Sequence, residues 1–218
     1  MVPAKIKETV ALGHDKKRFK QHRPHPWHGI EPMVEEPDTV RGFIEITQYD
    51  RIKFEMDPVT GYLCVDRPQR NSSLPPNPYG FIPQTLCGKR TGDFMKPGTP
   101  GDNDALDIVI LSEHELTRAE VVLEVRIIGA IETLDHNKAD PKIIAVLKGD
   151  LLWGELEELK DVPSSQVERL EHYFRQYKVE KGHENPVTVM GHCVRKKAIE
   201  LFSRSLEDYR EVFETSTT

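Results

Sequence analysis

Three aspartates lie close together in the segment 101–107, which reads GDNDALD. The apolar run from Ile108 to Leu111 follows directly and predicts a buried strand. Asp107 directly precedes this strand. Burial of its ionised carboxylate there costs free energy unless a positive charge nearby compensates for it. Carboxylate oxygens without a nearby Cys or His suit Mg²⁺, Mn²⁺ or Ca²⁺ rather than Zn²⁺. The segment therefore indicates either a site for a hard divalent cation or an acidic turn exposed to water.

The three carboxylates converge only if the chain turns between them. In an extended segment Asp102 and Asp104 point to one side and Asp107 to the other, but Gly101 and Asn103 permit a turn. An EF-hand calcium loop that began at Asp102 would need glycine where the chain has Asp107, and helices on both sides. Strand-like residues follow instead, so we exclude that motif.

Length and charge limit the class of protein. The chain has 218 residues and a formal net charge of -6. This length predicts one large domain with a sizeable core, and the charge argues against nucleic acid as the main partner. The sequence has no signal-peptide core at its start and no apolar run of membrane-spanning length. Three cysteines without a CxxC pair predict free thiols, so we expect a cytoplasmic protein with no membrane partner.

Residues 1–39 are polar and proline-rich, with a basic run at 16–20. We expect an N-terminal extension that packs on the body as an arm, because its prolines oppose a regular helix. Trp27 is the expected anchor of this arm, whereas His25 and His28 are more typical of structural histidines than of metal ligands. Residues 40–218 are expected to form a single domain.

Strand patterns dominate the middle of the chain. Residues 51–56 alternate strictly, with Ile52, Phe54 and Met56 on one face, and a turn then leads into a second strand that completes a hairpin by Arg67. Short strands with charge on one face favour a small antiparallel barrel or meander. Further strands are predicted at 42–46, 121–131 and 142–147, and 68–83 is expected to be irregular.

The last third of the chain has helical periodicity. Ser165 and Glu168 form a capping-box pattern. Strands first and helices last predict an α+β fold. The apolar stripes of two amphipathic helices are Val167, Leu170, Tyr173, Phe174 and Tyr177, and then Ile199, Phe202, Leu206, Tyr209 and Phe213.

The segment 88–101 is rich in glycine, lysine, arginine and proline. Long loops in compact domains are often functional. We nevertheless expect a surface insertion, because exposed loops tolerate insertion and deletion.

Acidic and basic residues recur where the strand patterns end or on one strand face. Acids that hold several cations, together with Lys and Arg that hold a polyanion, are the requirements of metal-assisted phosphoryl transfer. No glycine-rich nucleotide loop accompanies them. The acids are Glu45, Glu55, Asp102, Asp104, Asp107, Asp135 and Asp140; the bases are Lys53, Arg67, Lys142 and Lys178, with Tyr79 and Tyr177 nearby.

These residues occur in an order that resembles one known family, the soluble family I inorganic pyrophosphatases. The resemblance covers roughly residues 40–178, and several ordered motifs together make it specific. It is carried by Glu45, Lys53-Phe54-Glu55, Val65-Asp66-Arg67, Tyr79-Gly80-Phe81-Ile82-Pro83, the triple-aspartate segment 102–107, Asp135, Asp140, Lys142 and the pair Tyr177-Lys178.

The resemblance implies a five-stranded, OB-like β-barrel with helices packed outside, including C-terminal helices. It implies hydrolysis of pyrophosphate to two phosphates with several Mg²⁺ ions, for which Mn²⁺ is a substitute, and a homo-oligomer that is a hexamer or a dimer. Asp104 would be the general base. Asp102, Asp107 and Asp140 would hold the water-activating metals, Asp135, Glu55 and Glu45 would serve metals that arrive with substrate, and Lys53, Arg67, Tyr79, Lys142, Tyr177 and Lys178 would bind the phosphates.

The chain departs from the family pattern in places. Ala105 stands where the signature usually has proline, Pro75 stands where a second tyrosine is frequent, and the segment after Cys87 is longer than in compact members.

Two other classes of protein compete with this interpretation. A metal-dependent phosphatase or nuclease would need a pocket for an organic group, and a non-enzymatic OB-like binding module would need exposed aromatic residues and positive charge along a barrel face.

Overall fold

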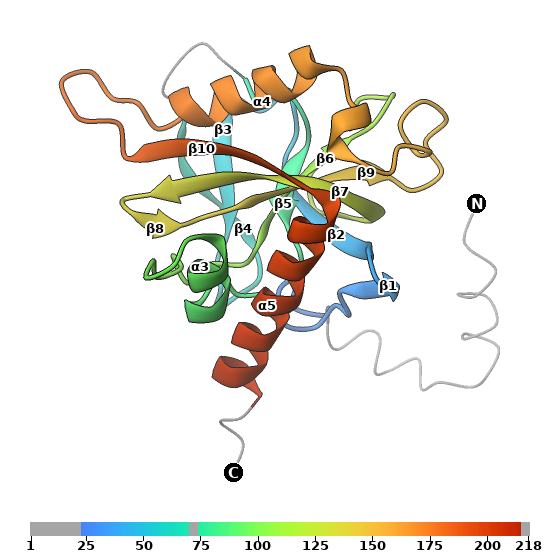
Figure 1. Ribbon diagram of the computed structural model, residues 1–218, viewed down its shortest axis with the longest axis horizontal. Helices are drawn as coiled ribbons and strands as arrows, with labels where there is room; N and C mark the ends of the chain where they lie inside the picture. The colour runs from blue at the N-terminus through green and yellow to red at the C-terminus, as the bar shows by residue number, and fades with distance from the viewer. Residues whose placement is uncertain (1–22, 70–73, 215–218) are drawn as a thin grey trace.

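Five strands close into a ring at the centre of the molecule. The computed structural model describes residues 23–69 and 74–214 (Figure 1). Around the ring every neighbouring pair is antiparallel except β6 and β9, which are parallel. The closed ring and the surrounding helices confirm the predicted α+β, OB-like barrel. In ring order the strands are β2 (Thr39–Ile46), β5 (Tyr79–Phe81), β6 (Asp107–Leu111), β9 (Lys142–Leu147) and β7 (Val121–Asp135), which pairs back to β2.

Strand β7 also pairs with strands outside the ring. It pairs with β10 (Val187–Val194) and β8 (Lys138–Ala139), while β1 (Met33–Glu35) is added to β2. The sequence patterns predicted neither β5 nor β10. The three residues of β5 are too few to show an alternation. In β10 the register shifts between Val189 and Gly191, which interrupts the period of two.

The predicted hairpin forms a separate two-stranded sheet beside the ring. It comprises β3 (Ile52–Met56) and β4 (Leu63–Pro68). Asp57 stabilises the turn between them by accepting hydrogen bonds from the Val59 amide at 2.9 Å and the Thr60 hydroxyl at 2.7 Å. On β3, Lys53 and Glu55 share a face, as the alternation predicts, and their side chains pair at 3.1 Å.

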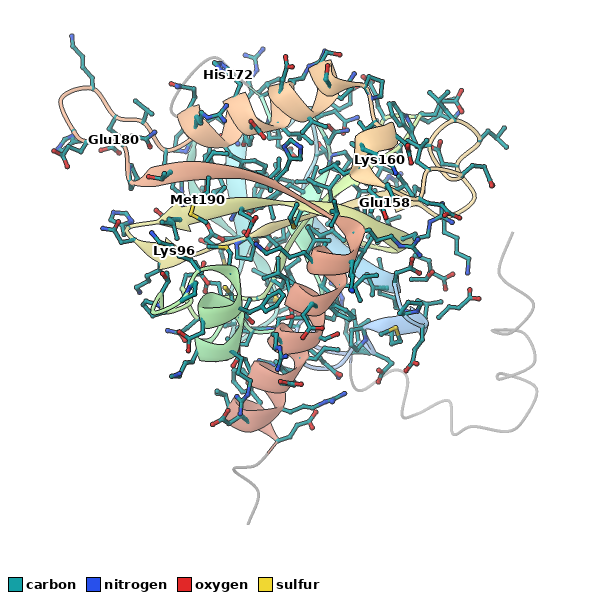
Figure 2. All side chains as sticks on the ribbon, in the orientation of Figure 1. Lys96, Glu158, Lys160, His172, Glu180 and Met190 are labelled. Atoms are coloured by element: carbon teal, nitrogen blue, oxygen red, sulfur yellow. The ribbon has the colours of Figure 1, made fainter. Side chains whose placement is uncertain are left out.

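Two long helices cover the sheet from opposite sides of β10 (Figure 1). The predicted stripes of α4 (Ser164–Gln176) and α5 (Arg195–Phe213) both supply buried core residues. The capping-box prediction is wrong: α4 starts at Ser164 after Pro163, without a side-chain cap, so Ser165 lies inside the first turn. A short 3-10 helix, η1 (Leu159–Asp161), precedes α4, and His172 on α4 points outward (Figure 2).

The segment 88–101 is not the exposed insertion that its composition predicts. It contains α3 (Lys89–Met95), in which Thr91, Gly92 and Met95 are buried. Met95 belongs to the same core cluster as Leu201 and Phe202 of α5. Glycine, lysine and proline in this segment conceal the helix, whose packing partner lies about one hundred residues away in the sequence. Lys89 and Arg90 at its start and Lys96 near its end face solvent, and Figure 2 labels Lys96.

Trp27 anchors the described part of the N-terminal arm, as predicted. The indole is buried, and its Nε1 donates a hydrogen bond to the Thr85 carbonyl at 2.7 Å. His28 Nδ1 lies 2.7 Å from the Tyr209 hydroxyl of α5, which ties the arm to the last helix. The basic run at 16–20 lies outside the described residues.

The three cysteines Cys64, Cys87 and Cys193 are unpaired, which confirms the predicted free thiols. Within residues 23–69 and 74–214, none of the helices has the length and apolar character needed to cross a bilayer.

We expect Met95→Ala to lower the free energy of unfolding by about 2 to 5 kcal/mol, because the truncation leaves a cavity between α3 and the barrel. Lys96→Ala, next to it but exposed, is the control and should change that free energy by no more than about 0.5 kcal/mol. Urea denaturation of both variants measures the difference. Equal effects of the two substitutions would show that α3 does not contribute to the core.

Candidate active site

A cavity of about 590 Å³ gathers nearly all the predicted site residues from distant parts of the chain. Strands β2, β3, β5 and β9, the segment 102–107, the end of β7 and the residues after α4 each contribute a side chain. The predicted residues that line it are Glu45, Lys53, Glu55, Tyr79, Asp102, Asp104, Asp107, Asp135, Asp140, Lys142, Tyr177 and Lys178.

Arg67 is the predicted residue that does not line this cavity. Its guanidinium forms an ion pair with Asp66, and the Asp66 carboxylate does line the cavity. Asp66 also accepts a contact of 3.0 Å from Lys53 Nζ. Arg67 therefore lies behind Asp66, one side chain away from the cavity wall.

A turn at Asn103 brings the three aspartates together. Asn103 has a φ of 70°, the left-handed conformation that asparagine adopts readily. The Asp104 amide donates to Asp102 Oδ1 at 3.1 Å, which closes the turn. All three carboxylates, including that of Asp107 at the start of β6, consequently border one cavity.

Lys142 lies among the carboxylates at the bottom of the site. It is 1% exposed, and its ammonium forms ion pairs with Asp107 and Asp140. The parallel register of β6 and β9 sets Asp107 directly beside Lys142. Burial opposes the charge on Lys142, but the two carboxylates outweigh it and raise the pKa of the ammonium well above its ordinary value. Lys142 is therefore charged at any physiological pH.

Two further ammonium groups are held by carboxylates at the cavity wall. Lys53 Nζ lies 3.1 Å from Glu55 Oε1 across the same face of β3. Lys178, just after α4, pairs with Asp135 at the end of β7. The cavity thus sets an ammonium group against a carboxylate at three places, at Lys53, Lys142 and Lys178.

Acidic groups nevertheless outnumber basic groups in the cavity. Burial raises the pKa of Glu45 to about 8, and the nearby charge of Asp107 adds to the effect. Burial likewise raises the pKa of Asp102 to about 6 and raises the pKa of Asp104 and of Asp140. Each shift means that the ionised carboxylates lack full compensation, which a bound cation would supply.

The donor set fits a hard divalent cation, since the acidic side chains offer only oxygen ligands. Among the described residues, no three His, Cys, Asp or Glu side chains already form a ready cluster for a metal ion. Lys142 explains part of this, because its ammonium lies between Asp107 and Asp140. The ammonium contacts Oδ2 of Asp107 and Oδ1 of Asp140, which leaves the second oxygen of each carboxylate available to a cation.

Several cavity residues were not among the sequence-derived candidates: Trp27, Asp57, Asp66, His136 and Lys138. Asp66 carried a signal, since it lies within the motif that contains Arg67. Lys138 and His136 lie in the acidic connection between Asp135 and Asp140. The sequence contains no comparable signal for Trp27 or Asp57. Only the packing of the arm and of the hairpin turn brings these two residues to the cavity wall.

A closed barrel whose cavity sets carboxylates against ammonium groups is suited to a polyanionic substrate. The sequence profile described as Inorganic pyrophosphatase matches residues 42–210. The inorganic pyrophosphatase of Chlamydia muridarum is 37% identical over 199 residues, which cover 87% of this chain and 95% of that protein.

Solved structures agree with these sequence matches. The inorganic pyrophosphatase from Thermus thermophilus superposes with a TM-score of 0.74 at 28% identity, covering 86% of this chain and 99% of that one. The enzyme from Helicobacter pylori superposes with a TM-score of 0.70 at 27% identity, covering 83% and 98%. The chain belongs to the family I inorganic pyrophosphatases, and its activity is the hydrolysis of inorganic pyrophosphate.

The raised carboxylate pKa values predict how stability depends on pH without metal. Glu45 titrates at about 8 in the folded protein against an ordinary 4.5, and Asp102 at about 6 against 3.8. Between these limits the folded state holds more protons than the unfolded chain, so the free energy of unfolding falls as pH rises. We expect the melting temperature in chelator to drop between about pH 5 and about pH 8.

Glu45→Gln is the control, because it keeps the acceptor for the Met56 amide at 2.8 Å but removes the titration. Its melting temperature should vary less with pH than that of the parent protein. A melting temperature that rises with pH in chelator would contradict the assignment.

Proposed function

We propose that this protein hydrolyses pyrophosphate with Mg²⁺, for which Mn²⁺ substitutes, by attack of a metal-activated water. The observation that supports the proposal is that one cavity is lined both by carboxylates of the loop 102–107 and by ammonium groups from β3, from β9 and from Lys178 after α4. Phosphoryl transfer depends mainly on positioning and on neutralising charge, and this arrangement provides both.

We assign the carboxylates to two groups. Asp107 and Asp140 pair with Lys142, and its charge also acts on Asp102. We assign these three to the cations that would lower the pKa of bound water toward neutrality. The remaining acids, Asp135, Glu55 and Glu45, are assigned to cations that enter with the substrate. Asp135 and Glu55 each already pair with a lysine, Lys178 and Lys53 respectively, so binding there exchanges one cation for another.

Asp104 is the proposed general base. It adjoins Asp102 across the Asn103 turn. Its carboxylate would therefore lie beside the cations that Asp102 holds, outside the Asp107–Asp140 pair. Burial and the charge of Asp107 raise its pKa, which brings a carboxylate closer to the proton affinity that a general base needs near neutral pH.

The phosphate groups would be bound by the basic wall. Lys53, Lys142 and Lys178 provide point charges, and Arg67 is expected to reach phosphate if it exchanges Asp66 for the substrate. Burial raises the pKa of Tyr79 and of Tyr177 above the ordinary phenol value. Both hydroxyls therefore remain protonated, and each can donate a hydrogen bond to a phosphate oxygen.

We also propose a cytoplasmic location, which is supported by the three unpaired cysteines. The family resemblance supports assembly as a homo-oligomer, a hexamer or a dimer. In each chain, the arm of residues 1–39 packs on one domain of residues 40–218. Neither nucleic acid nor a membrane is a partner.

Phosphate release from pyrophosphate tests the metal requirement. We expect turnover with Mg²⁺, slower or comparable turnover with Mn²⁺, and none after chelation with EDTA. An organic phosphate monoester at the same concentration is the control for a broader phosphatase. Sustained turnover in chelator would exclude the metal-dependent mechanism, and faster cleavage of the monoester would exclude pyrophosphate as the preferred substrate.

Two isosteric variants separate the general base from a metal ligand. Asp104→Asn should bind Mg²⁺ and pyrophosphate but lose about 10² to 10⁴ in kcat, which corresponds to about 3 to 5 kcal/mol of barrier. Asp107→Asn should lose Mg²⁺ affinity first, so excess Mg²⁺ recovers part of its rate. A Mg²⁺ titration of kcat compares them, and rescue of Asp104→Asn alone would mean that the two roles are reversed.

A further inference from the structure

The buried carboxylate of Asp208 in α5 holds the start of α3. Asp208 is 3% exposed and does not line the substrate cavity. Its Oδ2 accepts hydrogen bonds from the Gly88 amide at 3.1 Å, the Thr91 amide at 3.0 Å and the Thr91 hydroxyl at 2.9 Å. Its Oδ1 accepts from the Arg90 amide at 3.1 Å. One side chain from a distant helix therefore satisfies the backbone donors that begin α3.

No side chain within α3 could replace it. The residue that precedes the helix, Gly88, has no side-chain cap, so the first amide groups depend on Asp208. The Arg90 guanidinium, 3.3 Å from Oδ1, neutralises the buried charge. Truncation of Asp208 would leave several buried donors without an acceptor, which costs more than the loss of an exposed hydrogen bond.

The segment that Asp208 holds is bonded to the metal-binding loop through Cys87. The Cys87 amide donates to the Asp104 carbonyl at 2.7 Å, and the Asn103 amide donates to the Cys87 carbonyl at 2.9 Å. These two backbone hydrogen bonds clamp the turn between Asp102 and Asp104. Cys87 is next to Gly88 in the chain, so a displacement of the start of α3 moves both acceptor and donor.

A second connection is the close backbone packing of α3 against the residues that lead to Asp102. A Cβ placed on Gly92 would lie 2.3 Å from the Thr99 carbonyl oxygen and 2.7 Å from the Gly101 amide nitrogen. A Cβ on Gly101 would lie 1.9 Å from the Cys87 carbonyl oxygen. The helix and the loop that leads to Asp102 are therefore in direct backbone contact, without side chains that could adjust between them.

We propose that Asp208 is a positioning residue for the metal-binding loop: through α3 and Cys87 it fixes the geometry of Asp102 and Asp104. The proposal rests on the proposed function only in taking Asp102 as a Mg²⁺ ligand and Asp104 as the base. Asp208 acts without touching substrate or metal. It links the last helix of the chain to the turn whose shape decides how tightly the cations are held.

The test compares Asp208→Ala and Asp208→Asn with Glu207→Gln. Glu207→Gln is the matched control. It removes a neighbouring charge of the same helix whose Oε2 lies 3.8 Å from Arg90 Nε. It leaves the hydrogen bonds from the amides of Gly88, Arg90 and Thr91 to Asp208 in place. Hydrogen exchange of a peptide covering residues 99–106 reports the loop in metal-free protein. Calorimetric titration with Mg²⁺ alone gives the affinity, and kcat for pyrophosphate is measured over a Mg²⁺ series.

We expect Asp208→Ala to speed exchange in 99–106 and to weaken Mg²⁺ binding by about tenfold or more, with most of kcat recovered at saturating Mg²⁺. Asp208→Asn keeps one oxygen acceptor and should fall between Ala and the parent. Unchanged exchange and Mg²⁺ affinity in a folded Asp208→Ala protein would overturn the proposal, as would an equal effect of Glu207→Gln.

If both Asp208 variants fail to fold, Thr91→Val tests the positioning role instead. It removes one donor to Asp208 and retains the carboxylate, so it should produce a smaller change of exchange and affinity in the same direction; no change overturns the proposal. Failure of the proposed function is a separate result: the parent protein itself would then bind no Mg²⁺ or leave pyrophosphate intact, whereas exchange in 99–106 would still depend on Asp208.

Discussion

The buried contact of Lys142 with Asp107 and Asp140 is the interaction on which the site depends. One ammonium among carboxylates is stable only where each partner is held in place, because charges out of water are costly when a partner moves away. The parallel pairing of β6 and β9 provides that constraint by fixing Asp107 beside Lys142. The closed ring then keeps both strands from sliding, since every ring strand has a neighbour on each side.

The apolar core supports this charged centre from two directions. Helix α4 packs Tyr173 and Phe174 into the core cluster that contains β6 and β9 residues. The centroids of the Tyr79 and Phe174 rings lie 5.9 Å from Lys142 Nζ. Aromatic faces stabilise an ammonium without competing with carboxylates for its protons. The same packing lowers local polarity, which explains why burial is the largest cause of the raised carboxylate pKa values.

Helix α5 supports the opposite side. It supplies core residues such as Phe202 to the barrel and, through Asp208, the acceptor for the start of α3. The arm packs on the same helix, with the Trp27 and Phe213 rings 5.5 Å apart. The described part of the arm, helix α5 and the loop 102–107 are therefore connected through α3 and α5, although they are far apart in the sequence.

The sequence alone determined the residues with chemistry and the elements with clear periods. The alternation of 51–56, the β-branched run of β9 and the apolar stripes of α4 and α5 are local patterns, and the structure confirms them. The order of the acidic and basic motifs indicated the family, because these types at these spacings rarely occur together by chance.

Only the tertiary structure decided which of these groups meet. The parallel register of β6 and β9 sets Lys142 between its carboxylates, and the arm brings Trp27 to the cavity wall. Helix α3 went unpredicted because its cap, Asp208, comes from α5, and β5 because three residues carry no period. Local propensity acts over a few residues, whereas these features depend on contacts between segments distant in the chain, which no short-range pattern records.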